Sequence, residues 1–482
     1  MKVAVVVQRY GESINGGAEL HARYVAERLA RHVEVEVWTT CATDYVTWQN
    51  ALPPGADFVN GVPVRRFPVE RERDPLTFGR LSDKVFNHPH SIAEELAWLD
   101  AEGPTSPALI AHVAKHAASF DFCVFFSYRY YHAYYGARAA AGRAILVPTA
   151  ERDPAVGLAI FGPVFRGVSA LMYNSPEERL MIQSLSENQR VPSVVVGVGS
   201  DVPANPQPQR FRQKFDIREP YAIYIGRIDE NKGCRELFSY FEAYLGERAG
   251  RLSLVLVGKS ILDVPAHPRI RHLGFLDDKD KFDALAGADL LVMPSYFESL
   301  SMVALEAWAL GKPVLANARC DVLKGQCIRS NAGLYYENEL EFVETLRAIE
   351  QNQWIAGSLG RNGRQYFREH YDWPVIERKY LQMFERLAGS RMHAMEPLPG
   401  WLDRRQRNCL PSADIVASVP GGPVEAPEMN VPRPSSPPSP PLPERRPARD
   451  REPARARGAS PSRGRRSNHG HRPSGSTGAR RT

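Results

Sequence analysis

The chain has 482 residues, 43% of them hydrophobic, which is enough for two or three domains with full cores. Its net charge of +6 is uneven, because residues 431–482 hold 13 Arg, no Lys and 3 acidic residues, a net +10 that leaves −4 for residues 1–430. No run of about 18 apolar residues occurs, which excludes a helix that spans a membrane. The apolar run over residues 1–7 is too short for a signal peptide, so we expect a first strand there.

The cysteines are scattered along the chain without the Cys-x-x-Cys spacing of a metal site. Even the neighbouring pair Cys320 and Cys327 lacks nearby His or Cys partners. We therefore expect reduced thiols, as in a cytoplasmic protein, and no bound metal. The six positions are Cys41, Cys123, Cys234, Cys320, Cys327 and Cys409.

The amino-terminal segment predicts the opening of a nucleotide-binding α/β domain. A strand over residues 2–7 is followed by a loop with Gly16 and Gly17, and then by a helix. Paired glycines let a phosphate or a sugar approach the backbone closely. The helix shows the three-four spacing of a buried face at Ala18, Ala22, Val25 and Leu29.

Four further strands are expected in the first half of the chain. Their apolar patterns lie at residues 33–38, 61–67, 122–126 and 144–147. Between residues 68 and 120, charged loops and helical patterns at 92–99 and 108–118 indicate an elaboration, from which we expect acceptor contacts. Polar segments follow the last two strands at residues 127–132 and 148–153, and a strand near 194–196 closes the first domain.

A strand over residues 221–225 leads into a loop with Gly226, Arg227 and Lys232. A guanidinium and an ammonium five residues apart on a strand-to-helix loop can converge on one diphosphate. Neutralising a leaving diphosphate is what glycosyl transfer requires. The alternative is a pair of solvated basic side chains.

Asp278 and Asp280 could be mistaken for a metal-binding Asp-x-Asp pair, but we expect them to cap a helix over residues 281–286. Further along, Asp372-Trp-Pro predicts the start of another helix. One face of that helix would carry Trp373, Ile376, Tyr380, Met383 and Leu387.

The segment 289–316 is the central motif of the chain. A buried strand at 289–293 is followed by a loop, a helix and a second strand at 314–316, with Glu298 before the helix and Glu306 about two turns inside it. In a parallel sheet this junction lies where ligands bind, and the N–H groups of a helix start attract an anion. The carboxylates could then accept hydrogen bonds from sugar or ribose hydroxyls. The alternative is an ordinary amphipathic helix, but Glu306 lies among apolar residues, where an unpaired carboxylate is costly.

This motif, Glu298, seven residues, Glu306, and then Ala-Leu-Gly-Lys-Pro-Val, resembles the signature of the retaining glycosyltransferases of family four (glycosyl transferases group 1). The Gly-Gly loop, the Gly-Arg…Lys-Gly segment and the stretch Gly197–Asp201 are similar to that family's first loop, diphosphate motif and hinge. The resemblance covers residues 1–388. It implies the GT-B fold, an α/β architecture with two Rossmann-like domains around a cleft.

The resemblance also implies roles for individual residues. Arg227 and Lys232 would stabilise the departing diphosphate, and Glu298 would contact the donor sugar, which makes these three the catalytic candidates. The donor would otherwise be bound by Gly16, Gly17, Gly226, Phe275, Leu276, Leu300, Ser301 and Glu306. The resemblance implies no metal and no protein nucleophile. It also implies no cofactor, since the nucleotide-diphosphate-sugar is the donor substrate.

The chain departs from the family pattern in two places. Many members have a donor-contacting histidine after the strand at 144–147, where this chain has Glu151. Either Glu151 or His132 of the neighbouring loop could serve instead, although His132 fits a packing role in an aromatic cluster better. Residues 319–331 replace the usual glycine-rich loop.

We expect an acceptor-side domain over residues 1–200, a nucleotide-sugar domain over 201–372, and a helix over 373–392 that crosses back to the first domain. The composition of residues 393–482 predicts a disordered Pro- and Arg-rich tail that could bind RNA or anionic lipid, or remain solvated.

The expected activity is transfer of a sugar from a nucleotide-diphosphate-sugar donor to the hydroxyl of a sugar or lipid-linked acceptor, with retention. The setting would be cell-envelope polysaccharide or glycolipid synthesis, in the cytoplasm or peripheral to the inner face of the membrane. Two alternatives stay open: a nucleotide-sugar epimerase or phosphorylase of the same fold, and a catalytically silent body whose basic tail binds nucleic acid or membrane.

Overall fold

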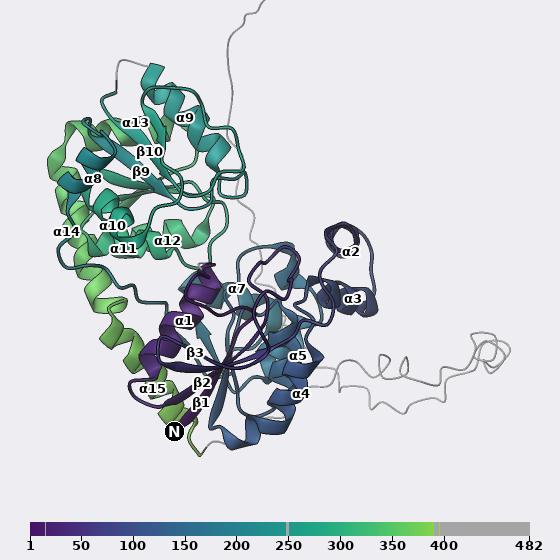
Figure 1. Cartoon of the computed structure of the whole chain (residues 1–482). Helices are drawn as coiled ribbons and strands as arrows, with labels where there is room; N and C mark the ends of the chain where they lie inside the picture. The colour runs from purple at the N-terminus through teal and green to yellow at the C-terminus, as the bar shows by residue number, and fades with distance from the viewer. Residues whose placement is uncertain (15, 247–249, 390–394, 396–482) are drawn as a thin grey trace, which may run out of the picture. The chain divides into compact units, whose positions relative to one another are not determined.

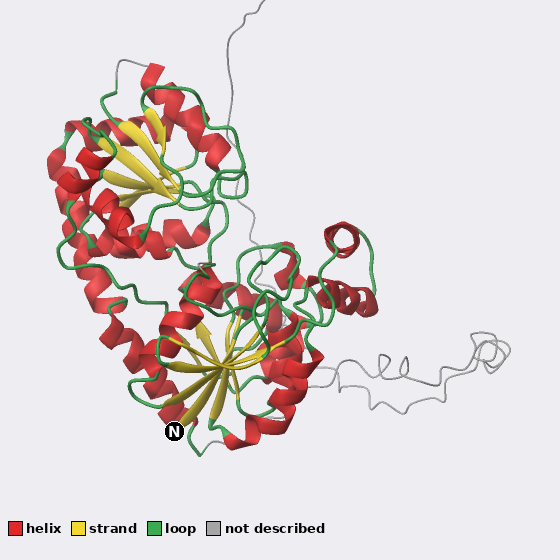
Figure 2. Cartoon of the chain, in the orientation of Figure 1, coloured by secondary structure: helices red, strands yellow, loops and turns green. Residues whose placement is uncertain are grey.

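Two β-sheets organise the computed structural model, which describes residues 1–14, 16–246, 250–389 and Met395 (Figures 1 and 2). Both sheets belong to one compact unit, residues 1–409. The amino-terminal sheet has the strand order β3-β4-β2-β1-β5-β6-β7-β8, and the carboxy-terminal sheet has the order β11-β10-β9-β12-β13-β14. The predicted domain limits stay predictions, and the predicted tail lies outside the described residues except for Met395.

The amino-terminal sheet is parallel except for β3, which pairs antiparallel with β4 at one edge. Its central strands, such as residues 2–6 and 122–126, are apolar runs because both faces are covered: Val3 and Val5 belong to one buried cluster, and Ala4 and Val6 to another. The strands are β1 (Lys2–Val6), β2 (Glu34–Thr40), β3 (Gly55–Val59), β4 (Val62–Phe67), β5 (Phe122–Phe126), β6 (Ala144–Val147), β7 (Ala170–Tyr173) and β8 (Ser193–Val195).

The helices of this lobe connect its parallel strands. They are α1 (Gly17–Leu29), α2 (Pro75–Asn87), α3 (Ile92–Glu102), α4 (Pro107–His116), α5 (Tyr131–Ala139), α6 (Phe161–Gly167) and α7 (Pro176–Ser186), with short 3₁₀ turns at Ala117–Ser119 and Pro154–Gly157. The elaboration predicted between residues 68 and 120 is present as α2 to α4. Its first helix, like β3, was missed by the sequence prediction.

The strands of the carboxy-terminal sheet all pair in parallel. They are β9 (Tyr221–Ile225), β10 (Ser253–Val257), β11 (Ile270–His272), β12 (Leu290–Met293), β13 (Val314–Asn317) and β14 (Gly333–Tyr336). The helices are α8 (Pro208–Lys214), α9 (Cys234–Gly246), α10 (Asp278–Gly287), α11 (Met302–Ala309), α12 (Asp321–Ser330), α13 (Glu339–Gln351) and α14 (Gln353–His370).

The last described helix, α15 (Trp373–Leu387), packs against α1 and β8 of the amino-terminal lobe. Its predicted apolar face is buried, and Phe384 stacks on Phe122 with ring centroids 5.3 Å apart. Trp373 at its start meets Tyr24 of α1 edge-on at 5.9 Å. Helix α15 therefore follows the carboxy-terminal sheet in sequence but packs into the core of the amino-terminal lobe.

Two local predictions need correction. Helix α11 begins at Met302 because the Ser301 side chain caps it, so Glu306 lies little more than one turn inside. Helix α10 is capped by Asp277, whose carboxylate accepts the Asp280 N–H, so Asp278 and Asp280 are not the caps; they pair with Lys281 and Lys214. Residues 319–331, for which the sequence made no structural prediction, contain α12.

The described cysteines, which exclude Cys409, are buried free thiols. Within the described residues, no helix is long and apolar enough to cross a membrane.

Candidate functional site

A cavity of about 570 Å³ lies where loops of the two sheets face each other. In each sheet the chain reverses its direction of winding at one point, between β1 and β5 in the first and between β9 and β12 in the second. The loops that leave the carboxyl ends of these four strands all contribute to the cavity wall. Crevices at such switch points are where open α/β sheets bind ligands.

The cavity brings together nine of the eleven predicted site residues, all of which lie in the described part of the chain. They are Gly16, Gly17, Gly226, Arg227, Lys232, Glu298, Leu300, Ser301 and Glu306. Phe275 and Leu276 are not among its lining residues: the Phe275 side chain is 72% exposed, and Leu276 belongs to the buried core.

The glycine loop after β1 is closely packed around an ion pair that the sequence did not reveal. Arg9 donates from Nε to Glu19 Oε1 at 2.8 Å and from Nη1 to the Thr43 carbonyl at 2.7 Å, and both charged side chains are buried. A Cβ on Gly16 would lie 2.2 Å from Glu19 Oε2, so a larger residue there would displace the Glu19 carboxylate. Arg9 thus forms a fixed positive group in the cavity wall.

Arg227 and Lys232, the two residues predicted to bind the diphosphate, contact acidic and aromatic side chains. Lys232 Nζ donates to Glu298 Oε1 at 2.7 Å. Burial opposes the charged form of Lys232, but the carboxylates of Glu298 and Glu151 outweigh it and raise the pKa of the ammonium. Arg227 pairs with Asp229 through Nε and donates from Nη1 to Tyr45 Oη at 2.7 Å.

Tyr45 comes from the loop after β2, in the other lobe, and its ring lies between two guanidinium groups. The Cζ atoms of Arg9 and Arg227 lie 5.6 and 5.8 Å from the ring centroid. The loop that carries Tyr45 is organised by Asp44, which accepts the N–H groups of Val46 and Thr47. The hydroxyl is therefore presented across the cleft on an ordered loop.

Glu306 is a buried carboxylate with one free oxygen. Oε1 accepts Ser200 Oγ at 2.9 Å and Lys281 Nζ at 3.2 Å, whereas Oε2 has no hydrogen-bond partner among the described residues. Only 3% of the residue is exposed. An unpaired buried carboxylate oxygen is costly unless a ligand's donor group satisfies it.

Other buried polar atoms on the cavity wall share this condition. Gln8 Oε1, His21 Nε2, Asn174 Oδ1 and Ser295 Oγ have no hydrogen-bond partner in the part of the protein that the structure describes. Native proteins leave few such groups unpaired. A cavity lined by them is built for a ligand with several hydroxyl or amide groups.

Glu151 is open to the cavity, and its pKa is raised to about 7. Burial is the main cause; Glu298 raises the pKa further, and Lys232 acts in the opposite direction. The alternative candidate His132 does not line the cavity. It is completely buried, its Nε2 lies 2.9 Å from the Phe126 carbonyl oxygen, and burial lowers its pKa to about 4, which fits a packing role.

Sequence reasoning missed Arg9, Tyr45 and Lys281, all of which line the cavity. Tyr45 and Arg227 are 182 residues apart, and neither Tyr45 nor Lys281 belongs to a recognisable motif. Among the described residues, no group of three or more His, Cys, Asp or Glu side chains could hold a metal ion.

Residues 207–366 match the family described as glycosyl transferases group 1. Among curated proteins, the chain is 24% identical over 196 residues to mannosylfructose-phosphate synthase of Agrobacterium fabrum (strain C58 / ATCC 33970), covering 37% of this chain and 43% of that protein. It is 31% identical over 163 residues to the lipopolysaccharide core biosynthesis glycosyltransferase LpsE of Rhizobium meliloti (strain 1021), covering 32% and 45% respectively. The chain thus spans less than half the length of these relatives.

Solved structures show the fold over a larger part of the chain. Anabaena HepE in complex with UDP-glucose superimposes with a TM-score of 0.58 at 18% identity, covering 80% of this chain and all of that one. The GT-B fold predicted from the motif is confirmed by such neighbours.

Proposed function

We propose, from the membership of residues 207–366 in the glycosyl transferases group 1 family, that this protein is a retaining glycosyltransferase. It would transfer a sugar from a nucleoside-diphosphate-sugar donor to an acceptor hydroxyl. One observation carries the proposal: Arg227, Lys232, Glu298 and the free oxygen of Glu306 meet in a single cavity between the two sheets.

The donor's diphosphate would lie between Arg227 and Lys232. In the structure these cations contact Asp229, Tyr45 and Glu298, and a bound diphosphate would replace the carboxylates as their partner. The N–H groups at the start of α11 face the same region and favour a negative charge. Stabilising charge on the leaving group is the main contribution expected of these residues.

The two carboxylates of the central motif would bind hydroxyl groups. The unpartnered Oε2 of Glu306 suits a ribose hydroxyl, since the residue lies in α11 beyond the proposed phosphate site. Glu298, released from Lys232 by the diphosphate, would accept a hydrogen bond from the donor sugar. Glu151 is placed to contact the sugar in the position where the family has histidine.

We assign no protein nucleophile. In this proposal the leaving phosphate takes the proton from the acceptor hydroxyl, and attack occurs on the face from which the leaving group departs. The chain's own residues bind and orient the donor and hold the charge on the diphosphate. No cofactor other than the donor substrate enters the proposal.

The acceptor is proposed to be a sugar or a lipid-linked sugar in cell-envelope polysaccharide or glycolipid synthesis, on the cytoplasmic side. Support comes from the similarity to a lipopolysaccharide core glycosyltransferase. A uridine nucleotide is the first donor to try, because the neighbouring HepE structure contains UDP-glucose.

The test combines ligand binding with turnover. Thermal shift with UDP, GDP and ADP, each alone and as sugar conjugates, should show stabilisation by one nucleoside diphosphate, since a ligand of the folded state raises the midpoint. Lys232→Ala should then lower turnover by about 10²–10³-fold while the unliganded midpoint stays near that of the wild type. Lys259→Ala, which removes an exposed lysine of the same lobe outside the cavity, is the matched control.

Undiminished transfer by Lys232→Ala would remove the diphosphate assignment. Release of the nucleotide without any acceptor would favour an epimerase instead, and formation of a sugar phosphate from a glycoside and phosphate would favour a phosphorylase.

A further inference from the structure

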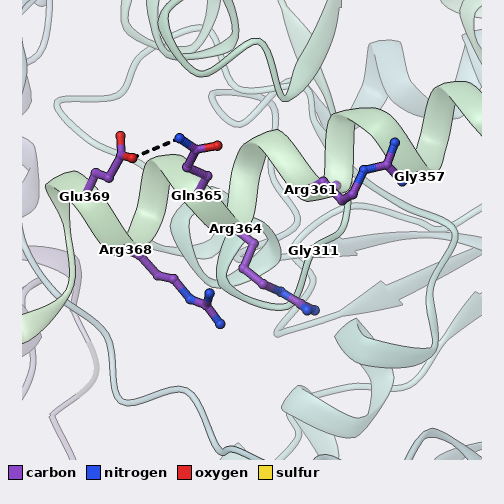
Figure 3. Close-up of a pocket in the computed structure, with 8 residues that line it drawn as sticks. Gly311, Gly357, Arg361, Arg364, Gln365, Arg368 and Glu369 are labelled. Atoms are coloured by element: carbon purple, nitrogen blue, oxygen red, sulfur yellow. Dashed lines mark hydrogen bonds between the residues drawn. The ribbon is translucent and has the colours of Figure 1, made fainter.

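A second hollow, of about 420 Å³, lies on the outer face of α14 and shares no lining residue with the cavity described above. Figure 3 shows that its side chains come almost entirely from this one helix, with Gly311 below. The lining residues are Gly311, Gly357, Gly360, Arg361, Arg364, Gln365, Arg368 and Glu369. Nothing in the proposed glycosyl transfer uses this surface.

Three arginines give the hollow its charge. Arg361, Arg364 and Arg368 are exposed and follow one another at the three-four spacing of a single helix face (Figure 3). Arg361 donates to Ser358 Oγ at 3.0 Å and Arg364 to the Leu310 carbonyl at 3.1 Å. No acidic side chain among the described residues forms an ion pair with any of the three.

The one acidic residue among the described residues that line the hollow, Glu369, offsets only one of the three positive charges. Glu369 Oε1 accepts the Gln365 amide at 2.9 Å and makes no ion pair within the described chain. Lys312, near Arg364, reports the resulting field: burial lowers its pKa, and Arg212 and Arg364 lower it further, against the opposing effect of Asp289. The surface around the hollow therefore carries uncompensated positive charge.

Close packing keeps α14 rigid and the hollow open. A Cβ on Gly360 would lie 2.0 Å from the Gly311 carbonyl oxygen, and one on Gly363 would lie 2.5 Å from the Trp308 ring. The helix is thus pressed against α11 and the turn after it, while exposed Gly357 presents no side chain.

An exposed tryptophan extends the same face. Trp354 is 78% exposed and lies seven residues before Arg361, two helical turns along the same stripe. From residue 354 to residue 368 the stripe is roughly 21 Å long, because a helix rises about 1.5 Å per residue. Arginines bind phosphate groups through paired N–H donors, and tryptophan favours the boundary between lipid and water.

We propose that this face of α14 docks the protein on an anionic lipid surface, with lipid phosphate groups in the arginine hollow and Trp354 in the headgroup layer. The Arg-rich segment 431–482 is excluded as the occupant, because it carries the same sign of charge. A straight, rigid stripe meets a flat surface with all four side chains at once, which distinguishes it from a site for one soluble phosphate.

The experiment compares two double variants of the full chain in co-sedimentation with vesicles. Arg361→Gln/Arg368→Gln removes two charges from α14 and retains Arg364, which contacts the Leu310 carbonyl. Arg463→Gln/Arg465→Gln removes the same charge from the carboxy-terminal segment. Vesicles of phosphatidylcholine with phosphatidylglycerol should bind the wild type, and pure phosphatidylcholine vesicles should not.

The α14 variant should lose about 30-fold in partitioning to the anionic vesicles, because each arginine contributes about fivefold. The control variant should lose clearly less. Its thermal midpoint and its response to nucleoside diphosphate should match the wild type, which separates this test from that of the proposed function. Quenching of tryptophan fluorescence by brominated lipid should fall in Trp354→Phe.

The proposal would be overturned if the α14 variant partitioned to anionic vesicles as strongly as the wild type. It would also be overturned if only the control variant lost vesicle binding. A loss of binding to single-stranded RNA without a loss of vesicle binding would overturn it too, since the face would then recognise nucleic acid.

Discussion

Glu151 is the residue whose protonation should be easiest to detect. Its pKa in the folded protein, about 7, lies above the ordinary value of 4.5, so its contribution to stability is complete below about pH 4.5 and is lost as the pH rises through 7. Glu151→Gln should therefore be more stable than the wild type at pH 8, by up to about 3 kcal/mol, and equal to it near pH 4.5.

Thermal midpoints of both proteins across this range measure the effect of Glu151. Glu72→Gln, at an exposed position, is the control and should follow the wild type at every pH. If the thermal midpoints of Glu151→Gln and the wild type differed by the same amount at every pH, the Glu151 carboxyl group would not titrate between pH 4.5 and 8.

We expect Tyr45 to contribute to donor binding from the opposite lobe. Tyr45→Phe removes the hydrogen bond from Arg227 but keeps the ring between the two guanidinium groups, so we expect the Kd for nucleoside diphosphate to rise about 3–10-fold. Tyr45→Ala removes both interactions and should weaken binding further. Titration calorimetry measures both, with Tyr335→Phe, partly exposed and outside the cavity, as control. Unchanged affinity in Tyr45→Ala would show that the stack plays no part in donor binding.

At the scale of elements, Ser301 at the start of α11 caps the helix and lies beside the proposed diphosphate site, and these two roles can be separated by substitution. The Ser301 hydroxyl accepts the Ala304 N–H at 3.2 Å, so Ser301→Ala should cost about 1 kcal/mol of stability. Ser301→Asp retains a capping oxygen but places a negative charge beside the proposed diphosphate. The aspartate variant should therefore keep its midpoint and lose most of its stabilisation by nucleoside diphosphate. Normal ligand stabilisation of that variant would place the diphosphate elsewhere.

At the scale of the molecule, α15 joins the two sheets into one cooperative unit. Phe384 is fully buried against Phe122, and a single buried cluster contains residues of both sheets and of α15. We expect one calorimetric transition for the wild type. Phe384→Ala should lower the free energy of unfolding by about 3–5 kcal/mol and separate the unfolding of the two lobes.

The control is Phe58→Ala, which changes an exposed side chain of edge strand β3 and should alter neither property. A wild-type protein that already unfolds in two transitions would contradict this view of α15.

Contacts between the lobes also constrain the cleft directly. Arg329 of α12 pairs with Glu177 of α7, and Arg152 pairs with Asp321 at 2.8 Å. Ser200, in the predicted hinge, donates to Glu306. A ribose hydroxyl at Glu306 would therefore bind beside a residue of the connection between the sheets.

The sequence alone determined what depends on local patterns. Apolar runs predicted most of the strands, because a parallel strand buried on both faces must be apolar throughout. The spacing within single strand-loop-helix units predicted Arg227, Lys232, Glu298 and Glu306 as site candidates, because each loop follows directly from its strand, and all four line one cavity. The error at α11 was also local: the Ser301 cap sets the helix start later than the apolar pattern suggests.

Only the tertiary structure decided which distant residues meet. Tyr45 reaches Arg227 across 182 positions, and Ser200 reaches Glu306 across 106. The arginine stripe of α14 became a hollow because Gly360 lets the helix approach Gly311. Such contacts arise from the packing of whole elements, which no periodicity or spacing along the chain encodes.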